Sequence, residues 1–302
     1  MTVQETLAEG KRLLVSPSPS AFIDTPALDA ALLLAETLRT RREELIAQGN
    51  EPISKQEREK FFRFLERRRS GECVAYILGH REFRGLRFSV NQHVLVPRPD
   101  TEILLEAALE YIGSIAEQEG NNLSLLDLCT GCGALAISLK NERPFLAVSA
   151  SDISDPALEI AGFNAARLLE TGGLSENRRS SVRFIQSDLF KNIAGKFNII
   201  VCNPPYVPSD EINTLAPEVQ QEPRIALDGG EDGMDFIRKI ISRAPEHLLP
   251  GGVLLLEADP KQMPAIRCLL ETRGFSNIRL HNDLAGRERV ISGRIKFTTP
   301  KE

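Results

Sequence analysis

Hydrophobic positions follow two successive patterns along the chain. Up to about residue 69 they recur at helical spacing, with Leu28 and Leu32 in one stripe and Phe61 and Leu65 in another, which predicts amphipathic helices. Beyond residue 121 the chain alternates between helical stretches and short apolar runs, namely 123–128, 145–150, 182–185, 197–202 and 253–256. Such alternation is typical of a parallel sheet whose two faces are both covered by helices.

The last two apolar segments, near 278–280 and at 289–295, predict a further pair of strands. Only residues 282–288 separate them, which is too short for a crossover helix, so we expect these strands to pair antiparallel. Together with the earlier runs they make an expected sheet of seven strands.

A third pattern lies between the two regions. Residues 83–96 alternate with a short period around Asn91-Gln92, which predicts a β-hairpin. Asp100 or Thr101 then has the chemistry and position to cap a helix ahead of an apolar stripe. We therefore expect a helical N-terminal domain over residues 1–82, a hairpin linker over 83–100 and an α/β domain over 101–302.

Composition narrows the classes of function. The 302 residues are 42% hydrophobic and 26% charged, with a formal net charge of −5, so the chain lacks the excess of Lys and Arg that stable nucleic-acid binding requires. Its basic clusters at 39–42 and 67–69 are interpreted as solvated helix ends, with an acidic or RNA-bearing partner as the alternative. No apolar run reaches the roughly 18 residues of a membrane span, and no signal-peptide pattern opens the sequence. We expect a cytoplasmic protein without membrane contact.

The cysteines indicate reduced thiols. They are five in number and scattered, unlike the paired framework of a disulfide-rich secreted domain. Cys129 and Cys132 form a C-x-x-C pair, for which a redox pair or half of a zinc site is the alternative. Because no second pair or nearby histidine completes a ligand set, no metal is expected.

The first candidate site is a glycine loop at the end of a strand. Its sequence, Asp127 to Gly133, reads D-L-C-T-G-C-G and precedes a helix, where glycines bring the backbone close to a ligand and a helix N-terminus favours negative groups. Asp152 ends the next strand, 21 residues beyond Gly131, the spacing at which an acid reaches ribose hydroxyls. The loop is G-x-G without the later glycine, so a dinucleotide is less favoured.

A third strand ends at Asp188-Leu189. Here the carboxylate would accept a hydrogen bond from the amino group of an adenine, and Leu189 would cover the face of the ring. The alternative for Asp188 is a helix cap or a turn residue.

The fourth strand runs into Asn203-Pro204-Pro205-Tyr206. Two prolines end the ladder and fix the backbone, so carbonyl groups there point in set directions. The Asn203 side-chain oxygen and the Pro204 carbonyl would accept both hydrogens of a planar NH2 group while Tyr206 stacks on its face. This arrangement suits methyl transfer from a sulfonium to a poorly nucleophilic nitrogen. We assign catalysis to Asn203, Pro204 and Tyr206, and acceptor binding to the whole tetrapeptide.

With these motifs the chain resembles the seven-strand Rossmann-like amino-group methyltransferases, and among them the HemK/PrmC family of protein-glutamine methyltransferases. The tetrapeptide alone is shared with adenine-amino methyltransferases of DNA and RNA. Further similarity to the family lies in residues 76–79, 82–85, 96–102, 222–230, 232–233 and 283–289. The sequence departs from the family at Cys129 and Cys132, where glycine and a small hydroxyl residue are usual, and at 254–259, which replaces a Glu-Ile-Gly ending.

The resemblance implies a cofactor, an acceptor and a partner. The cofactor would be S-adenosylmethionine, and the acceptor the glutamine of the Gly-Gly-Gln motif in class 1 peptide-chain release factors, which the N-terminal domain would contact. The resemblance and the positions at strand ends together predict the residues that bind the cofactor, which are Cys129, Thr130, Gly131, Cys132, Gly133, Asp152, Asp188, Leu189 and Asn203.

Several alternatives remain open. A ribosomal-protein glutamine or an adenine amino group would be a different acceptor, and a cofactor-binding interaction module would have no turnover. Arg98 and Glu102 would either position the cofactor or cap and pair at a helix start, and Arg224 is likewise functional or structural.

Overall fold

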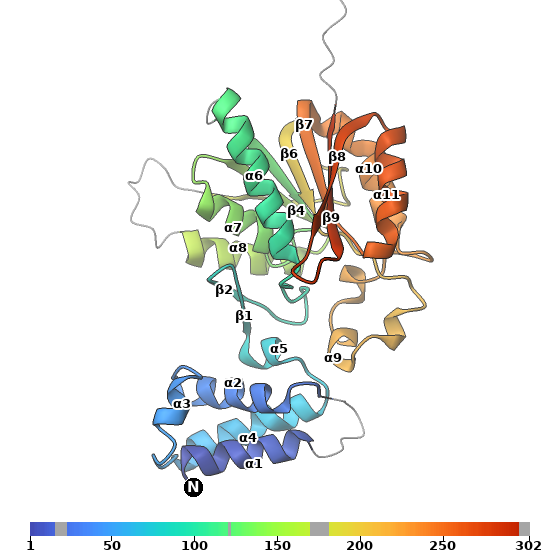
Figure 1. Ribbon diagram of the computed structural model, residues 1–302. Helices are drawn as coiled ribbons and strands as arrows, with labels where there is room; N and C mark the ends of the chain where they lie inside the picture. The colour runs from blue at the N-terminus through green and yellow to red at the C-terminus, as the bar shows by residue number, and fades with distance from the viewer. Residues whose placement is uncertain (16–22, 120–121, 170–180, 296–302) are drawn as a thin grey trace, which may run out of the picture. The chain divides into compact units, whose positions relative to one another are not determined.

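The computed structural model describes residues 1–15, 23–119, 122–169 and 181–295. The chain forms two compact units (Figure 1). The first comprises Met1–His80 together with Asn213–Glu222, and the second comprises Arg81–Ile212 and Pro223–Glu302. A short segment after the Asn-Pro-Pro-Tyr motif thus groups with the helical unit.

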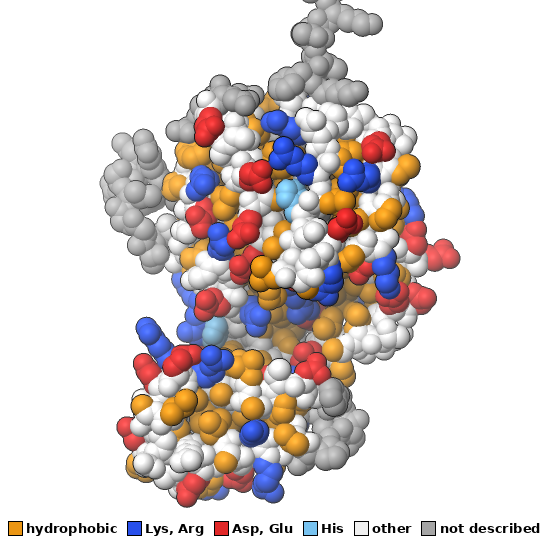
Figure 2. All heavy atoms as spheres, viewed as in Figure 1, with side chains coloured by type: hydrophobic (Ala, Val, Ile, Leu, Met, Phe, Trp, Pro, Cys, Tyr) orange, Lys and Arg blue, Asp and Glu red, His pale blue; other side chains and the backbone are white. Residues whose placement is uncertain are grey.

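The first unit is helical, as the apolar periodicity predicted. Its core is formed by fully buried side chains such as Leu33, Leu34 and Phe61. The helices are α1 (Val3–Val15), α2 (Pro26–Leu38), α3 (Glu44–Ala47), α4 (Lys55–Arg69), α5 (Val74–Leu78) and, from the later segment, α9 (Pro217–Gln220). On the face seen in Figure 2, acidic and basic side chains are interspersed over this unit.

Helix α4 begins with a capping box. The Ser54 side chain accepts from the Glu57 amide, and the Glu57 carboxylate accepts from the Ser54 amide, which satisfies two backbone donors at the helix start. At the other end Arg68 is buried and pairs with Asp29 at 2.6 Å and with Glu218 of α9 at 2.5 Å. The interpretation of residues 67–69 as a solvated face is therefore wrong for Arg68, whose charge is paired with the buried Asp29 and the more exposed Glu218.

The hairpin is displaced from its predicted position. Strands β1 (His80–Phe83) and β2 (Leu86–Ser89) flank Arg84 and Gly85, whose φ values of 51° and 72° suit a tight primed turn. The second half of the predicted hairpin, around residues 94–96, forms no strand. Val94 and Val96 are buried there, and the Asn91 side chain accepts from the His93 amide at 2.9 Å in a local turn.

The second unit is built on the predicted seven-strand sheet. Its strands lie in the order β5-β4-β3-β6-β7-β9-β8, the first five parallel and β9 antiparallel to both β7 and β8, so the predicted C-terminal strand pair is confirmed. The strands are β3 (Ser124–Leu128), β4 (Ala147–Asp152), β5 (Arg183–Gln186), β6 (Phe197–Cys202), β7 (Leu248–Glu257), β8 (Phe275–Asn282) and β9 (Glu288–Ile295).

Helices cover both faces of this sheet. Helices α10 and α11 pack on one face, where alternate strand residues such as Leu126 and Ile200 form a shared core with Ile240 and Ile266 (Figure 1). The helices of this unit are α6 (Thr101–Glu119), α7 (Ala134–Glu142), α8 (Asp155–Leu169), α10 (Asp235–His247) and α11 (Met263–Thr272), with short 3-10 turns at Arg224–Ala226 and Pro260–Gln262. A further 3-10 turn, Ile212–Thr214, spans the boundary between the two units. Over the described ranges, no helix combines the length and apolarity needed to cross a membrane.

The sheet topology sets the position of a ligand site. The chain runs from β3 outward to β4 and β5 and then returns to β6 on the other side of β3. Ligands in such sheets bind beyond the carboxyl ends of the strands at this reversal. Strands β3, β4 and β6 end there, immediately before or at Cys129, Asp152 and Asn203.

Candidate functional site

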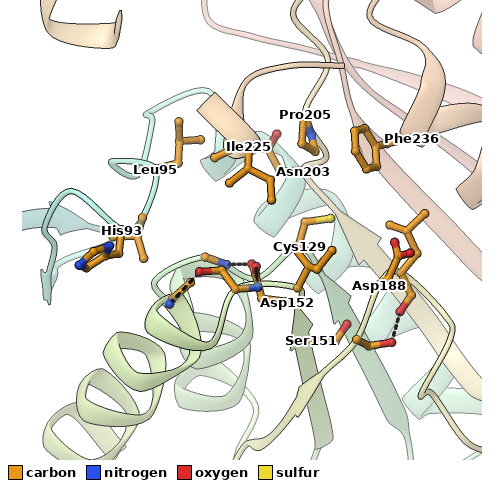
Figure 3. Close-up of a pocket in the computed structure, with 18 residues that line it drawn as sticks. His93, Leu95, Cys129, Ser151, Asp152, Asp188, Asn203, Pro205, Ile225 and Phe236 are labelled. Atoms are coloured by element: carbon orange, nitrogen blue, oxygen red, sulfur yellow. Dashed lines mark hydrogen bonds between the residues drawn. The ribbon is translucent and has the colours of Figure 1, made fainter. Parts of the chain in front are cut away.

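A cavity of about 780 Å³, partly open to solvent, lies at the carboxyl ends of these strands (Figure 3). Among the residues predicted for the cofactor and acceptor, it is lined by Cys129, Gly131, Asp152, Asp188, Leu189, Asn203 and Pro205. Residues far apart in the sequence thus converge on one space.

Asp152 is held rigidly at this cavity. Its Oδ2 accepts from the Gly131 amide at 2.9 Å and its Oδ1 from the Ser154 amide at 3.0 Å (Figure 3). Each carboxylate oxygen has a second lone pair, so Asp152 can also accept from hydroxyl groups of a ligand. Burial raises the pKa of Asp152, against the lowering effect of these backbone hydrogen bonds.

The glycine loop brings its backbone to the cavity through unusual dihedrals. Cys129 has φ 58° and Gly131 has φ 54°, both in the left-handed region where a Cβ is disfavoured. A Cβ on Gly131 would meet no atom within 4 Å, because the residue borders open space. Gly133 differs, since its φ of 85° favours glycine and its Cβ would also lie 2.7 Å from the end of the Ile137 side chain.

Thr130 and Cys132, two of the predicted cofactor residues of the loop, make contacts outside the cavity. The Thr130 hydroxyl donates to Asp127 at 2.6 Å, and the Cys132 carbonyl accepts from Asn164 at 3.0 Å. Neither they nor Gly133 lines the cavity. Burial raises the pKa of the Cys132 thiol to about 12, so it stays protonated and is unsuited to the redox alternative.

The turn after β5 presents Leu189 to the cavity. Leu189 has φ 47°, and the Ser187 hydroxyl donates to its carbonyl at 2.7 Å (Figure 3), which holds this conformation. Asp188 lines the cavity from an exposed position, while its carbonyl accepts from Lys191 at 3.1 Å. Asp188 is therefore both a turn residue and a residue of the cavity wall.

At the acceptor motif, Asn203 and Pro205 line the cavity but Pro204 and Tyr206 do not. The Asn203 amide nitrogen donates to the Thr101 hydroxyl at 3.2 Å. The Tyr206 carbonyl accepts from Gln262 at 2.9 Å. Burial raises the pKa of the Tyr206 phenol well above its ordinary value. The motif is thus anchored on both sides by segments distant in sequence.

The residues whose role was left open make structural contacts. Arg224 donates to Asp228 at 3.0 Å, four residues later on the loop that packs against the motif. The Glu102 carboxylate accepts from the Arg84 amide at 3.4 Å, at the hairpin turn. Arg98 lies close enough to Tyr206 for its charge to lower the pKa of the phenol. Glu102 and Arg224 lie outside the cavity lining.

Sequence reasoning missed several residues of the cavity wall. Most are apolar or come from connections outside the motifs, and they include His93, Val94, Leu95, Ser151, Ile153, Ser154, Ala157, Ser187, Ile225, Ala226 and Phe236. Ser151, Ile153 and Ser187 lie next to Asp152 or Asp188 in the sequence, so their position at the same strand ends could have predicted them. Phe236 and Ile225 have no comparable signal, since only the folded chain brings them to this space.

The lining suits the nucleoside sulfonium expected from the motifs. Asp152 offers carboxylate oxygens to a ligand, and Leu95, Leu189 and Phe236 offer apolar surface. The charged side chains recorded in the lining are the carboxylates Asp152 and Asp188, with no Lys or Arg beside them. A cationic ligand is therefore favoured over a phosphorylated one.

Comparisons with known proteins cover nearly the whole chain. A model described as the PrmC N-terminal domain matches residues 5–79, and one described as the methyltransferase small domain matches residues 106–230. A release factor glutamine methyltransferase of Burkholderia pseudomallei is 38% identical over 271 residues, 89% of this chain and 92% of that protein. Another, of Pseudomonas aeruginosa, is 39% identical over 295 residues, 97% and 99% of the two chains.

A solved structure shares the fold alone. The hMettl16 catalytic domain, in complex with a 3′UTR hairpin, is 14% identical, with a TM-score of 0.52, over 78% of this chain and 83% of that chain. At this identity the likeness extends to the arrangement of the sheet and its helices, not to the acceptor.

Proposed function

The chain belongs to the release factor glutamine methyltransferase family, as its motifs predicted, and we propose that it methylates the glutamine of the Gly-Gly-Gln motif in class 1 peptide-chain release factors. It is a methyltransferase enzyme by that membership. The methyl donor would be S-adenosylmethionine, and the acceptor atom the side-chain amide nitrogen. The reaction would take place in the cytoplasm, where release factors act.

The observation that carries this proposal is the position of Asn203 on the wall of the cavity. Its amide nitrogen is engaged by Thr101 at 3.2 Å, so its oxygen is the group left to accept from an acceptor nitrogen. A glutamine amide bonded to that oxygen would lie beside the ligand in the cavity. Asn203 would therefore bring donor and acceptor together.

On the cofactor side, Asp152 would hold the ribose hydroxyls and Leu189 would cover the adenine. Asp188 would accept from the adenine amino group. Cys129 and Gly131 would let the backbone pass close to the ligand. The bound cofactor would supply a methyl group activated by its sulfonium.

On the acceptor side, the amide nitrogen is a poor nucleophile because its lone pair is delocalised. The Asn203 oxygen and the Pro204 carbonyl would accept its two hydrogens, which stabilises positive charge as the new carbon–nitrogen bond forms. Tyr206 would pack on the flat face of the amide. The helical N-terminal domain, residues 1–82 in the sequence-based division, would contact the release factor.

The test is a competition for label. The protein is incubated with methyl-labelled S-adenosylmethionine and, in parallel, with a release factor, a ribosomal-protein fraction and DNA. We expect label on the release factor, and none when its Gly-Gly-Gln glutamine is replaced by glutamate. Label only on ribosomal protein or only on DNA would replace the proposed acceptor with that class.

A further inference from the structure

A buried carboxylate lies directly behind Asn203. Strands β6 and β7 run parallel with Cys202 opposite Leu256, so the next residues, Asn203 and Glu257, occupy adjacent strand ends. The first residue of α6, Thr101, completes the group. Asn203 donates to the Thr101 hydroxyl at 3.2 Å, and both side chains lie close enough to the Glu257 carboxylate for their hydrogen bonding to lower its pKa.

Glu257 has no direct access to the cavity. Its exposed fraction is 1%, that of Thr101 is 6%, and neither residue lines the cavity. Its Oε2 has no hydrogen-bond partner among the described residues, so the carboxylate is only partly satisfied. A buried, half-satisfied carboxylate is costly to stability, which indicates a role other than packing.

The chemistry of the carboxylate sets the orientation of the Asn203 amide. An ionised carboxylate only accepts hydrogen bonds, whereas an amide has a donating end and an accepting end. The NH2 group of Asn203 must therefore face Glu257 and Thr101, and its oxygen must face away from them. With a neutral Glu257, which can also donate, the opposite orientation becomes available.

We infer that Glu257 is a positioning residue: with Thr101 it fixes the Asn203 amide so that the oxygen, not the nitrogen, meets the acceptor amide. The inference rests on the proposed role of Asn203 in binding that amide. The Thr101 hydroxyl is a relay that donates to the carboxylate and accepts from Asn203.

The ionisation of Glu257 gives this arrangement a pH dependence. Burial raises the pKa of Glu257 to about 7, Asp100 adds to the rise, and Arg289 on β9 opposes it. Tyr206 also faces this carboxylate, and its own pKa is raised in part by Glu257. The amide orientation is therefore fixed above about pH 7, and turnover is expected to increase with pH through that value.

The first experiment uses isosteric variants. Glu257→Gln and Thr101→Val remove the charge and the relay hydroxyl without a large change in volume, and Thr101→Ser restores the hydroxyl. Glu257→Gln and Thr101→Val should lower kcat roughly 10- to 100-fold and leave the Kd for S-adenosylmethionine within about twofold, while Thr101→Ser should retain most of the activity. The increase of turnover with pH near 7 should be absent in Glu257→Gln. Ser292→Ala, which removes a fully buried hydroxyl from β9, is the matched control with unchanged kcat.

The deciding experiment places Glu257→Gln in an Asn203→Ala background. If Glu257 acts through Asn203, the double variant turns over as slowly as Asn203→Ala alone, because the effects of residues that act as a unit do not add. An equal fall in both backgrounds, or wild-type kcat in Glu257→Gln, would overturn the inference. Thermal unfolding of each variant identifies any that misfold. If Glu257→Gln misfolds, the comparison of Thr101→Val with Thr101→Ser tests the inference instead.

Different results would contradict the proposed acceptor and the positioning role of Glu257. A wild-type enzyme that leaves the release factor unlabelled contradicts the proposed acceptor. The ratio of variant to wild-type turnover is then measured on whichever acceptor takes the label, so the positioning role is tested in either case.

Discussion

The amide of Gly131 donates to Asp152 at 2.9 Å, so the loop after β3 and the end of β4 hold each other in place. Asp152 also lines the cavity, and its carboxylate oxygens have lone pairs left for a ligand. The hydrogen bond thus couples the shape of the glycine loop to the group that would bind ribose.

Replacing Asp152 should therefore weaken cofactor binding. Asp152→Ala removes the charged acceptor of two backbone amides and of the ribose hydroxyls, and hydrogen bonds to a charged group contribute about 1.5–3 kcal/mol. We expect the Kd for S-adenosylmethionine to rise at least about tenfold by calorimetry. Asp152→Asn, which keeps one accepting oxygen, should fall between wild type and alanine. An unchanged Kd in Asp152→Ala would rule out the ribose contact.

Cys129 has φ 58° at the position where the family usually has glycine. Cys129→Gly should relieve the backbone, whereas Cys129→Ala removes the same sulfur but retains the Cβ. The free energy of unfolding of the glycine variant should exceed that of the alanine variant by about 1 kcal/mol. Glycine avoids the strain of a Cβ in the left-handed region, and this gain outweighs the greater entropy that glycine gives the unfolded chain. Chemical denaturation of the two variants measures the difference, and a more stable alanine variant would contradict the argument.

Asp127 should make stability depend on pH. Burial raises its pKa from an ordinary value of 3.8 to about 7, so the folded state binds the proton more tightly than the unfolded state does. The resulting stabilisation is complete below the unfolded pKa and is lost as the pH rises through about 7. The free energy of unfolding should therefore decrease less with rising pH, between about 4 and 7, in Asp127→Asn than in the wild-type protein. The pKa values of Glu257 and Asp152 are shifted in the same direction, and both should contribute to the slope that remains. An unaltered slope in the variant would contradict the assignment.

In the helical unit, Arg68→Ala should be strongly destabilising. It leaves Asp29, whose side chain is 6% exposed, without the partner that lies 2.6 Å away, and breaking a buried ion pair costs about 3–5 kcal/mol. Arg42→Ala is the control, because the pair of Arg42 with Glu43 is exposed and worth about 1 kcal/mol or less. Equal losses in the two variants, measured by denaturation, would argue against a special role for the buried pair.

Strands buried on both faces could be predicted closely from the sequence, because a continuous apolar run leaves little ambiguity. Strand β6 has the predicted bounds, 197–202. Strand β7 begins at Leu248, whereas the sequence predicted a start at 253 because Pro250-Gly251-Gly252 interrupts the apolar run. The strand continues through this segment with an irregularity in the register of its pairing with β6. The hairpin was misplaced because the buried Val94 and Val96 alternate as the residues of a strand do, although no strand forms there.

The site was predictable where it coincides with strand ends. Asp152, Asp188 and Asn203 each follow or end a recognisable strand, so their convergence follows from the parallel topology. The contact between Thr101 and Asn203 joins residues 102 positions apart, and no local pattern encodes it. Phe236 belongs to the same class, since its place in the cavity wall depends on how α10 packs.

Glutamine methylation is measured by the mass of the release-factor peptide that contains Gly-Gly-Gln, after incubation with S-adenosylmethionine and either wild-type protein or Asn203→Ala. We expect this peptide to gain one methyl group, located on the glutamine side chain, with wild-type protein. With Asn203→Ala the gain should be strongly reduced although cofactor affinity stays within a few-fold. An unmodified peptide with wild-type protein, or equal methylation by Asn203→Ala, would contradict this expectation.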